Sequence, residues 1–376
     1  MPQILPSLLG AALLALGAGL ATAAPPAPKA ADACAETSRW VLAGGKRLQA
    51  APPAGPLGEA LASEVVLLGE QHDQEDHHRW QLQVLAALHA QRPDLVIGFE
   101  MFPRRLQPVL DRWVNGELSA REFITQSEWE QVWNFPPQLY MPLFEFARLN
   151  RIPMLALNVD AKLTRAIADK GWQGVPAAER EGVGRPAAPQ PAYRDLLREL
   201  HRSHLAGRRQ AGKPDNSFEN FLDAQLAWDR AMAEALAARL GPAGGPRRPL
   251  VVGVMGSGHI NFDHGVPHQL RDLGVKKVTT LLPVSGREAC AALPPGIADA
   301  VFVLPERPAA SPEPPRLGVT LEDQGKGVRI AQLNPGSLAE RYGLKAGDRI
   351  VELAGRAPGS SAEVSAAIRR QPPGTW

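Results

Sequence analysis

A short glycine–histidine element occurs twice in this chain and constrains its fold more than any other feature. The copies are Gly69-Glu70-Gln71-His72 and Gly256-Ser257-Gly258-His259. Each follows an apolar run, Val65-Val66-Leu67-Leu68 or Leu250-Val251-Val252-Gly253-Val254, of the kind that forms buried parallel strands. The carboxyl ends of parallel strands meet at one edge of a sheet, where ligand sites form. The repeat therefore predicts a pocket to which two distant segments of the chain contribute.

Further apolar runs alternate with helical patterns, which indicates the class of the main domain. The stretch 171–214 is polar and interrupted by prolines, and its segment 193–209 could form a solvated helix. The alternation predicts an α/β fold with a mostly parallel sheet flanked by helices. Besides 65–68, strands are expected at 95–99, 153–157, 251–255, 278–283 and 301–304, and helices at 74–90, 107–113 and 217–240.

The length of the chain bounds the number of domains, and its net charge bears on whether it binds nucleic acid. A chain of 376 residues with 44% apolar content suits two or three domains and can bury a sizeable core. Its net charge is only +2, and no basic stripe lies along a predicted helix, so we expect no nucleic-acid partner.

The amino terminus reads as an export signal. The apolar run 8–20 is shorter than the roughly 20 residues that a membrane span needs, and Ala21-Thr22-Ala23 supplies a small-residue cleavage site. We therefore expect residues 1–23 to be a signal peptide, with no transmembrane helix left after cleavage. Residues 24–60 are expected to form a linker and a lead-in segment. The mature protein would be periplasmic or attached to the envelope.

Two cysteines, Cys34 and Cys290, leave two alternatives open. In an oxidising compartment they could form a disulfide, or both could stay unpaired, because the sequence does not show how close their backbones lie. Cys34 follows Ala31-Asp32-Ala33 rather than a leucine and small residues. We therefore do not expect a lipid anchor at Cys34.

Residues 316–376, after a proline-rich linker at 305–315, resemble a PDZ domain of the bacterial, circularly permuted kind. The segments 334–339 and 343–350 carry the resemblance, in the usual order and spacing. It implies that Leu317-Gly318-Val319 form the loop that receives the terminal carboxylate of a partner protein. The chain ends where such domains continue into one more strand. This predicts either a truncated record or an open sheet edge.

Four residues that could carry chemistry, Glu70, His72, Glu100 and His259, fall at predicted strand ends of the main domain. Buried carboxylates and imidazoles are costly unless they are paired or bind a ligand. Two histidines and a carboxylate suit a divalent metal, and a water bound to that metal would be a nucleophile. The alternative is that both glutamates accept backbone N–H groups of the following helices. The neighbouring His77-His78 pair is predicted to face solvent.

The main domain resembles the ChaN family of haem-binding proteins over residues 64–282. This family belongs to the superfamily of the Tiki proteases, TraB proteins and erythromycin esterases. The resemblance implies a bacterial envelope protein that binds haem through a tyrosine and serves iron uptake or handling, with a homodimer that holds haem between its subunits. The motifs that carry it are 67–73, 98–102, 140–143, 156–158, Ala224-Gln225-x-x-x-Asp229-x-x-Met232-Ala233 and 256–259.

The resemblance leaves one tyrosine as the candidate iron ligand. Tyr342 belongs to the PDZ-like unit and Tyr193 to the polar stretch, so Tyr140, among aromatic neighbours, is the hypothesis for haem iron. Glu70, His72 and His259 are then expected to line the haem pocket. The alternative for Tyr140 is an amphipathic side chain whose hydroxyl lies at the surface.

Two other functions stay open. The Tiki branch has paired Gly-x-x-His motifs and a glutamate, which implies a metal-dependent hydrolase of peptides or esters. In that case His72, Glu100 and His259 would hold zinc, manganese or cobalt, and Glu70 would be the general base. The third function is an envelope scaffold in which only the PDZ-like unit binds a partner.

Overall fold

The computed structural model describes residues 30–52, 54–133, 135–210, 217–241, 248–306, 317–325, 327–353 and 355–369. The predicted signal peptide, most of the proline-rich linker and the last residues of the chain lie outside these ranges. Among the described residues, the helices are too short or too polar to cross a bilayer.

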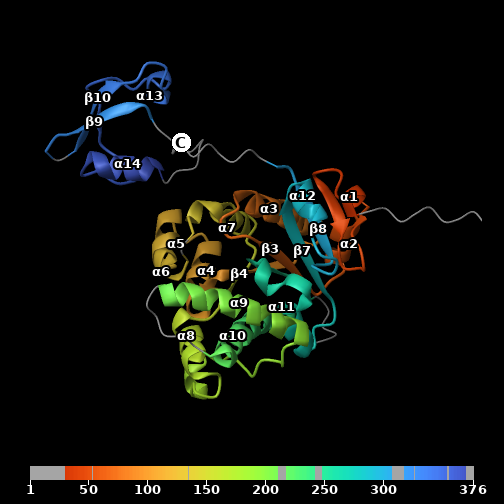
Figure 1. Ribbon diagram of the computed structural model, residues 1–376. Coiled ribbons are helices and arrows are strands. Elements are labelled where there is room, and N and C mark those ends of the chain that lie inside the picture. The colour runs from red at the N-terminus through yellow and green to blue at the C-terminus, as the bar shows by residue number, and fades with distance from the viewer. Residues whose placement is uncertain are drawn as a thin grey trace, which may run out of the picture.

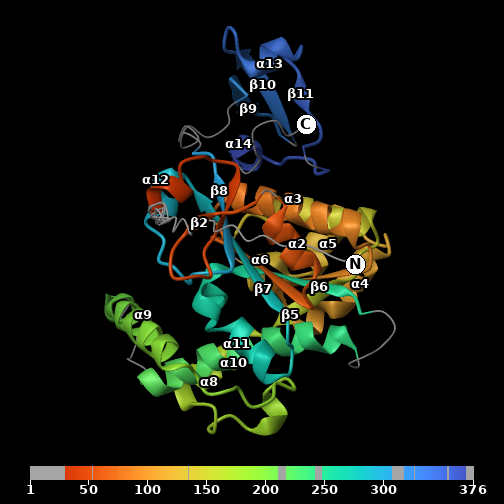
Figure 2. The same ribbon diagram turned by 90° about the vertical axis from the view of Figure 1, so that its right-hand side faces the viewer.

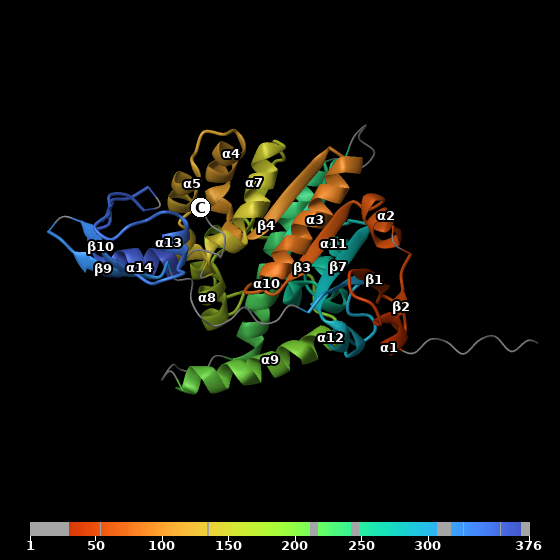
Figure 3. The same ribbon diagram turned by 90° about the horizontal axis from the view of Figure 1, so that it is seen from above.

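An eight-stranded sheet forms the centre of the main unit, in the order β2-β1-β8-β7-β3-β6-β4-β5 (Figures 1 and 3). All neighbouring strands from β8 to β5 run parallel, whereas β1 and β2 are antiparallel additions at one edge. The strands are β1 (Arg39–Leu42), β2 (Gln49–Ala50), β3 (Val65–Glu70), β4 (Leu95–Pro103), β5 (Met154–Asn158), β6 (Leu250–Gly256), β7 (Val278–Ser285) and β8 (Ala300–Leu304).

The predicted mostly parallel sheet is confirmed, and its strands begin within a residue or two of their expected positions. The sequence did not predict β1 and β2, which come from the segment expected to lead into the domain. They are short, and β2 is exposed, so they lack the apolar periodicity that marks a strand. They are recognised as strands only in the structure, where β1 pairs with β8 and β2 pairs with β1.

Helices cover both faces of the sheet, so its strands are apolar on both sides (Figure 1). Leu68 packs in one core with Trp80 and Phe144, while its neighbour Leu67 packs in the other with Met232. The helices of the main unit are α1 (Ala30–Ala33), α2 (Gly55–Leu61), α3 (Glu75–Gln91), α4 (Gln107–Val114), α5 (Ala120–Gln126), α6 (Trp129–Val132), α7 (Met141–Leu149), α8 (Ala161–Lys170), α9 (Pro191–Gln210), α10 (Phe218–Ala237), α11 (Val266–Asp272) and α12 (Arg287–Ala291).

Helix α9 lies in the polar stretch 171–214, where the sequence left a solvated helix open at 193–209. It begins at Pro191, a residue type suited to the first turn because its missing N–H would have no partner there. Tyr193 and Leu197 are buried against α10, whereas Leu196 and Leu200 are exposed. The helix packs on α10 (Figure 2). The surrounding prolines and charges concealed a narrow apolar stripe.

A disulfide between Cys34 and Cys290 resolves the open question about the cysteines. It joins the residue after α1 to α12, with a Cα–Cα distance of 5.8 Å, and both residues are buried. The bond ties the start of the described chain to the edge of the sheet that carries β1 and β8.

The C-terminal unit is small and mixed, as predicted. Its antiparallel sheet has the order β11-β10-β9, and its core contains Val328, Ile330, Ala339 and Val364. Its elements are β9 (Val319–Asp323), β10 (Val328–Leu333), α13 (Leu338–Arg341), β11 (Arg349–Ile350) and α14 (Ser361–Arg369).

Candidate functional site

The two glycine–histidine elements lie side by side at the carboxyl edge of the sheet. Glu70 ends β3 and Gly256 ends β6, and the two residues are paired in register. Glu100 comes from β4, the neighbour of β6 on its other side. Residues distant in sequence therefore meet because three adjacent strands end together.

Glu70 is the centre of a first buried cluster. Its Oε1 accepts hydrogen bonds from Tyr140 Oη at 2.9 Å and from His72 Nδ1 at 2.8 Å. Its Oε2 lies 3.3 Å from His78 Nδ1 and accepts from Gln81 Nε2 at 3.0 Å. Burial raises the pKa of Glu70, but the bonds to His72 and His78 outweigh it and lower the pKa to about 2. Glu70 is therefore a buried carboxylate anion at neutral pH.

His259 is the centre of a second cluster. Its Nδ1 donates to Asp229 Oδ1 at 2.7 Å, and Asp229 Oδ2 accepts from Tyr193 Oη at 2.7 Å. Its Nε2 lies 3.5 Å from Glu100 Oε1, and Glu100 Oε2 accepts from Gly256 N at 2.6 Å. Burial lowers the pKa of His259, but Glu100 and Asp229 raise it to about 10. This imidazole is therefore cationic at neutral pH.

The two clusters repeat one pattern, which we call the paired Tyr–carboxylate–His arrays. The first is Tyr140–Glu70–His72 and the second is Tyr193–Asp229–His259. A tryptophan lies edge-on to each histidine. Trp133 is 4.8 Å from His72 and Trp228 is 4.7 Å from His259 between ring centroids.

Sequence reasoning gave no site role to three members of these clusters, Tyr193, His78 and Gln81. Tyr193 was set aside because it lies in the polar stretch. For Asp229, one turn from Gln225 in a quoted motif, the sequence left open whether it points at the pocket or caps a neighbouring loop, and the structure bonds it to His259. The prediction that His78 faces solvent is wrong, and so is that for His77. Both are buried because the first turn of α3 directs this face toward the sheet. The repeated Gly-x-x-His spacing gave no signal for the side chains that bond to each histidine.

Tyr140 is buried, so its hydroxyl does not lie at the surface as one of the two alternatives predicted. Its ring is buried, it stacks near Phe144, and its hydroxyl donates to Glu70. Burial and the charge of Glu70 raise the pKa of this phenol, which disfavours the phenolate that holds ferric haem iron. It is not among the residues that line the cavity described next.

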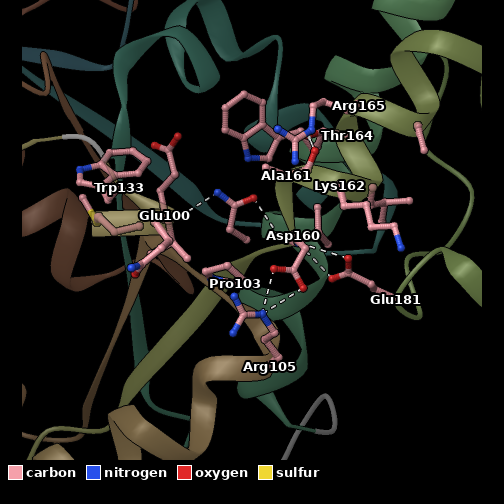
Figure 4. Close-up of a pocket in the computed structure, with 18 of the residues that line it drawn as sticks. Glu100, Pro103, Arg105, Trp133, Asp160, Ala161, Lys162, Thr164, Arg165 and Glu181 are labelled. Carbon is pink, nitrogen blue, oxygen red and sulfur yellow. Dashed lines mark hydrogen bonds and ion pairs between the residues drawn. The ribbon is translucent and has the colours of Figure 1, made fainter. Parts of the chain in front are cut away.

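A cavity of about 840 Å³ opens beside the arrays (Figure 4). His72 lines it with a side chain that is 29% exposed, and Trp133 and Phe135 pack against that imidazole. Because His72 Nδ1 is bonded to Glu70, Nε2 is the nitrogen left for a ligand. Trp228 also lines the cavity, and its buried indole N–H has no partner among the described residues.

Gly256 provides the space that the His72 ring occupies. A Cβ at this position would lie 2.9 Å from His72 Cε1, and the ring cannot yield easily because Glu70, Trp133 and Phe135 hold it. We expect Gly256→Ala to lower the free energy of unfolding by about 1–3 kcal/mol through overpacking, as measured by urea denaturation.

Gly258→Ala is the matched control for that variant. A Cβ at Gly258 would meet nothing within 4 Å, so the urea midpoint of Gly258→Ala should stay close to that of the original chain. Equal midpoints for the two variants would contradict the close packing of His72 on Gly256.

The described residues contain no group of three or more His, Cys, Asp or Glu side chains placed to hold a metal ion. Glu100 and His259 are paired with each other rather than directed at a common point. The metal-dependent alternative therefore gains no support from this arrangement.

The predicted peptide-binding loop lies just before and at the start of β9. Gly318 has φ +74° and approaches Ser337, and its carbonyl accepts from Asn334 N. The Leu317 carbonyl accepts from Ala339 N. These bonds fix the loop to α13 and to the segment before it, and peptide binding there stays a prediction.

Comparison with family models identifies the main unit. The model described as "Haem-binding uptake, Tiki superfamily, ChaN" matches residues 57–270, more than half of the chain. The chain belongs to the ChaN family. A second model, "PDZ domain", matches residues 329–375, which confirms the PDZ resemblance of the C-terminal unit.

A solved structure of a ChaN protein shares the fold of this ChaN-family chain. A structure described as cofacial haem binding to ChaN of Campylobacter jejuni has a TM-score of 0.52 at 18% identity, and the match covers 70% of this chain and 95% of that one. The type III effector HopBA1 has a TM-score of 0.37 at 10% identity, with 68% and 96% of the chains covered. An erythromycin esterase, EreC, has a TM-score of 0.36 at 10% identity, with 61% and 71% covered. No curated protein matches the chain.

Proposed function

We propose that this ChaN-family chain binds haem in the cavity at the carboxyl edge of β3, β4 and β6. The observation that carries the proposal is a partly exposed imidazole, His72, set among aromatic rings in a cavity of about 840 Å³. That volume lies within the roughly 300–1,000 Å³ of small-molecule sites. Apolar rings suit a porphyrin face, and an imidazole nitrogen suits its iron.

His72 is the group that would hold the iron. Its Nδ1 donates to the Glu70 anion, the outer-shell bond that metal-ligating histidines usually make, and this fixes the tautomer with Nε2 available. Tyr140 is the second candidate, but ligation by its oxygen would require the bond to Glu70 to break. When bound, haem supplies an iron centre whose properties depend on the axial ligand. Glu70 would set the basicity of that ligand.

Export and a role in iron uptake or handling form part of the proposal. The predicted signal peptide supports export, and so does the Cys34–Cys290 disulfide, because disulfides persist mainly in oxidising compartments. Cell fractionation and N-terminal sequencing test this, with the mature chain expected to begin at Ala24. A homodimer and a peptide partner for the PDZ domain are further proposals that rest on family resemblance.

A haemin titration tests the haem site. We expect saturable binding with a Soret shift, and His72→Ala should weaken it by about tenfold or more, since even outer-shell partners of metal ligands are worth about 10–100-fold. His89→Ala is the control, because His89 lies on α3 away from the cavity lining.

The other outcomes of this titration are also decisive. If Tyr140→Phe abolishes the Soret shift and His72→Ala does not, a tyrosinate holds the iron and the ligand assignment is reversed. If the unmodified chain shows no saturable binding, the haem proposal fails.

A further inference from the structure

The turn that carries His72 is held by side chains from outside it. His72 lies between β3 and α3, and its backbone carbonyl accepts a hydrogen bond from His78 Nε2 at 3.2 Å and lies 3.3 Å from Tyr140 Oη. The amide of the preceding residue, Gln71, donates to His77 Nδ1 at 3.0 Å. The backbone that bears the His72 imidazole is therefore fixed by bonds to α3 and to the start of α7.

His78 joins this backbone to the carboxylate that bonds the His72 ring. While its Nε2 donates to the His72 carbonyl, its Nδ1 lies 3.3 Å from Glu70 Oε2 and 3.3 Å from Gln81 Oε1. The other oxygen of Glu70, Oε1, accepts from His72 Nδ1 at 2.8 Å. One imidazole therefore contacts both groups that orient His72, its backbone and its carboxylate partner.

The packing around His78 leaves it no other partners to choose. Its side chain is 2% exposed, and its ring lies 4.3 Å from that of Tyr140 between centroids. Gln81, three residues further along α3, donates its amide N–H to Glu70 Oε2 at 3.0 Å and turns its oxygen toward His78. His78 is not among the residues that line the cavity. Its influence on a ligand in the cavity must therefore pass through His72.

We propose that His78 is a positioning residue for haem iron, which holds Glu70 and the His72 carbonyl together and so keeps Nε2 of His72 available to the iron. This proposal rests on the proposed haem function and on His72 as the iron ligand. Bonds to both the ring and the backbone of His72 leave it few orientations. A group that is ordered before binding loses less conformational freedom when it binds, so its affinity is higher.

A comparison of haemin with iron-free protoporphyrin IX tests this role, because only haemin contains an iron for His72 to hold. Quenching of tryptophan fluorescence in the full chain measures the binding of both, since Trp133 and Trp228 line the cavity. His78→Phe keeps a ring beside Tyr140 and removes both N–H donors. We expect this variant to weaken haemin binding about tenfold and protoporphyrin binding by less than about twofold, since outer partners of metal ligands are worth about 10–100-fold.

His78→Asn is the second variant. Its shorter side chain retains a donor near the position of Nδ1, toward Glu70, but does not reach the His72 carbonyl. It should also weaken haemin more than protoporphyrin, so the proposal remains testable if His78→Phe does not fold in urea denaturation. His89→Phe is the matched control, because it makes the same substitution on α3 away from the cavity lining. It should leave both affinities unchanged.

The other outcomes separate this role from the haem function. If the folded His78 variants bind haemin as tightly as the original chain, His78 does not position the iron ligand and the proposal is overturned. An equal loss of haemin and protoporphyrin affinity would also overturn it, because His78 would then act on the shape of the cavity and not through the iron. In both cases the haem function stands. Failure of the original chain to bind haemin would instead reject the haem function itself.

Discussion

Replacing Asp229 with alanine should lower the free energy of unfolding by about 3–5 kcal/mol, the usual cost of removing one partner of a buried ion pair. Asp229 is fully buried and is bonded to both His259 Nδ1 and Tyr193 Oη. Its loss would leave a buried imidazole with only the longer contact to Glu100, at 3.5 Å, and a buried phenol hydroxyl without its acceptor. The second Tyr–carboxylate–His array would therefore collapse as a unit.

Urea denaturation followed by tryptophan fluorescence measures this loss. All tryptophans other than Trp376 lie between Trp40 and Trp228, so the signal reports on the main unit. Glu219→Ala on the same helix is the control, because its ion pair with Arg194 is largely exposed and such pairs are worth about 0–1 kcal/mol. A loss for Asp229→Ala no larger than that of the control would refute the buried array.

The pH dependence of stability provides an independent check of the same array. The pKa of His259 is raised to about 10, so the folded chain keeps a proton that the unfolded chain releases near pH 6.5. The resulting stabilisation is complete below about pH 6.5 and is lost as the pH rises toward about 10, at no more than about 1.4 kcal/mol per pH unit. Asp229→Ala should reduce this decline, because one of the two carboxylates that raise the pKa is gone.

Removal of the disulfide is the second large effect that we expect. The double variant Cys34→Ser/Cys290→Ser should lose about 3–5 kcal/mol of unfolding free energy, because the bond closes a very long loop in the unfolded chain. The sequence separation of the two cysteines is 256 residues, which places the loop-entropy contribution at the upper end of its range. In the folded state both sulfurs are buried beside α12, so the variant also exchanges apolar contacts for hydroxyls.

Reduction of the disulfide in the original chain tests the same contribution to stability without a substitution. Urea midpoints with and without dithiothreitol should differ in the original chain and coincide in the double variant. If dithiothreitol does not change the urea midpoint of the original chain, the disulfide does not stabilise the fold and the prediction is wrong.

The sequence predicted the parts of the fold that depend on local pattern. Runs such as Val65-Val66-Leu67-Leu68 are apolar at every position because helices cover both faces of a parallel sheet, so strand and sheet type could be read directly. The edge strands β1 and β2 were not predicted, and α9 was only a possible, solvated helix. Their apolar residues are few, and partners elsewhere in the chain, β8 and α10, stabilise them.

The same division applies to the site. The sequence alone determined that Glu70, His72, Glu100 and His259 gather at one edge, because the hydrophobic runs show where the strands end and the carboxyl ends of parallel strands share an edge. Only the tertiary structure decided which side chains form hydrogen bonds with each histidine and with its carboxylate partner. Asp229 reaches His259 from α10 and accepts a hydrogen bond from Tyr193 on α9, and Tyr140 reaches Glu70 from the start of α7. Such contacts join residues whose spacing in the chain follows no period, because the packing of helices on the sheet, and not local backbone geometry, brings them within hydrogen-bonding distance.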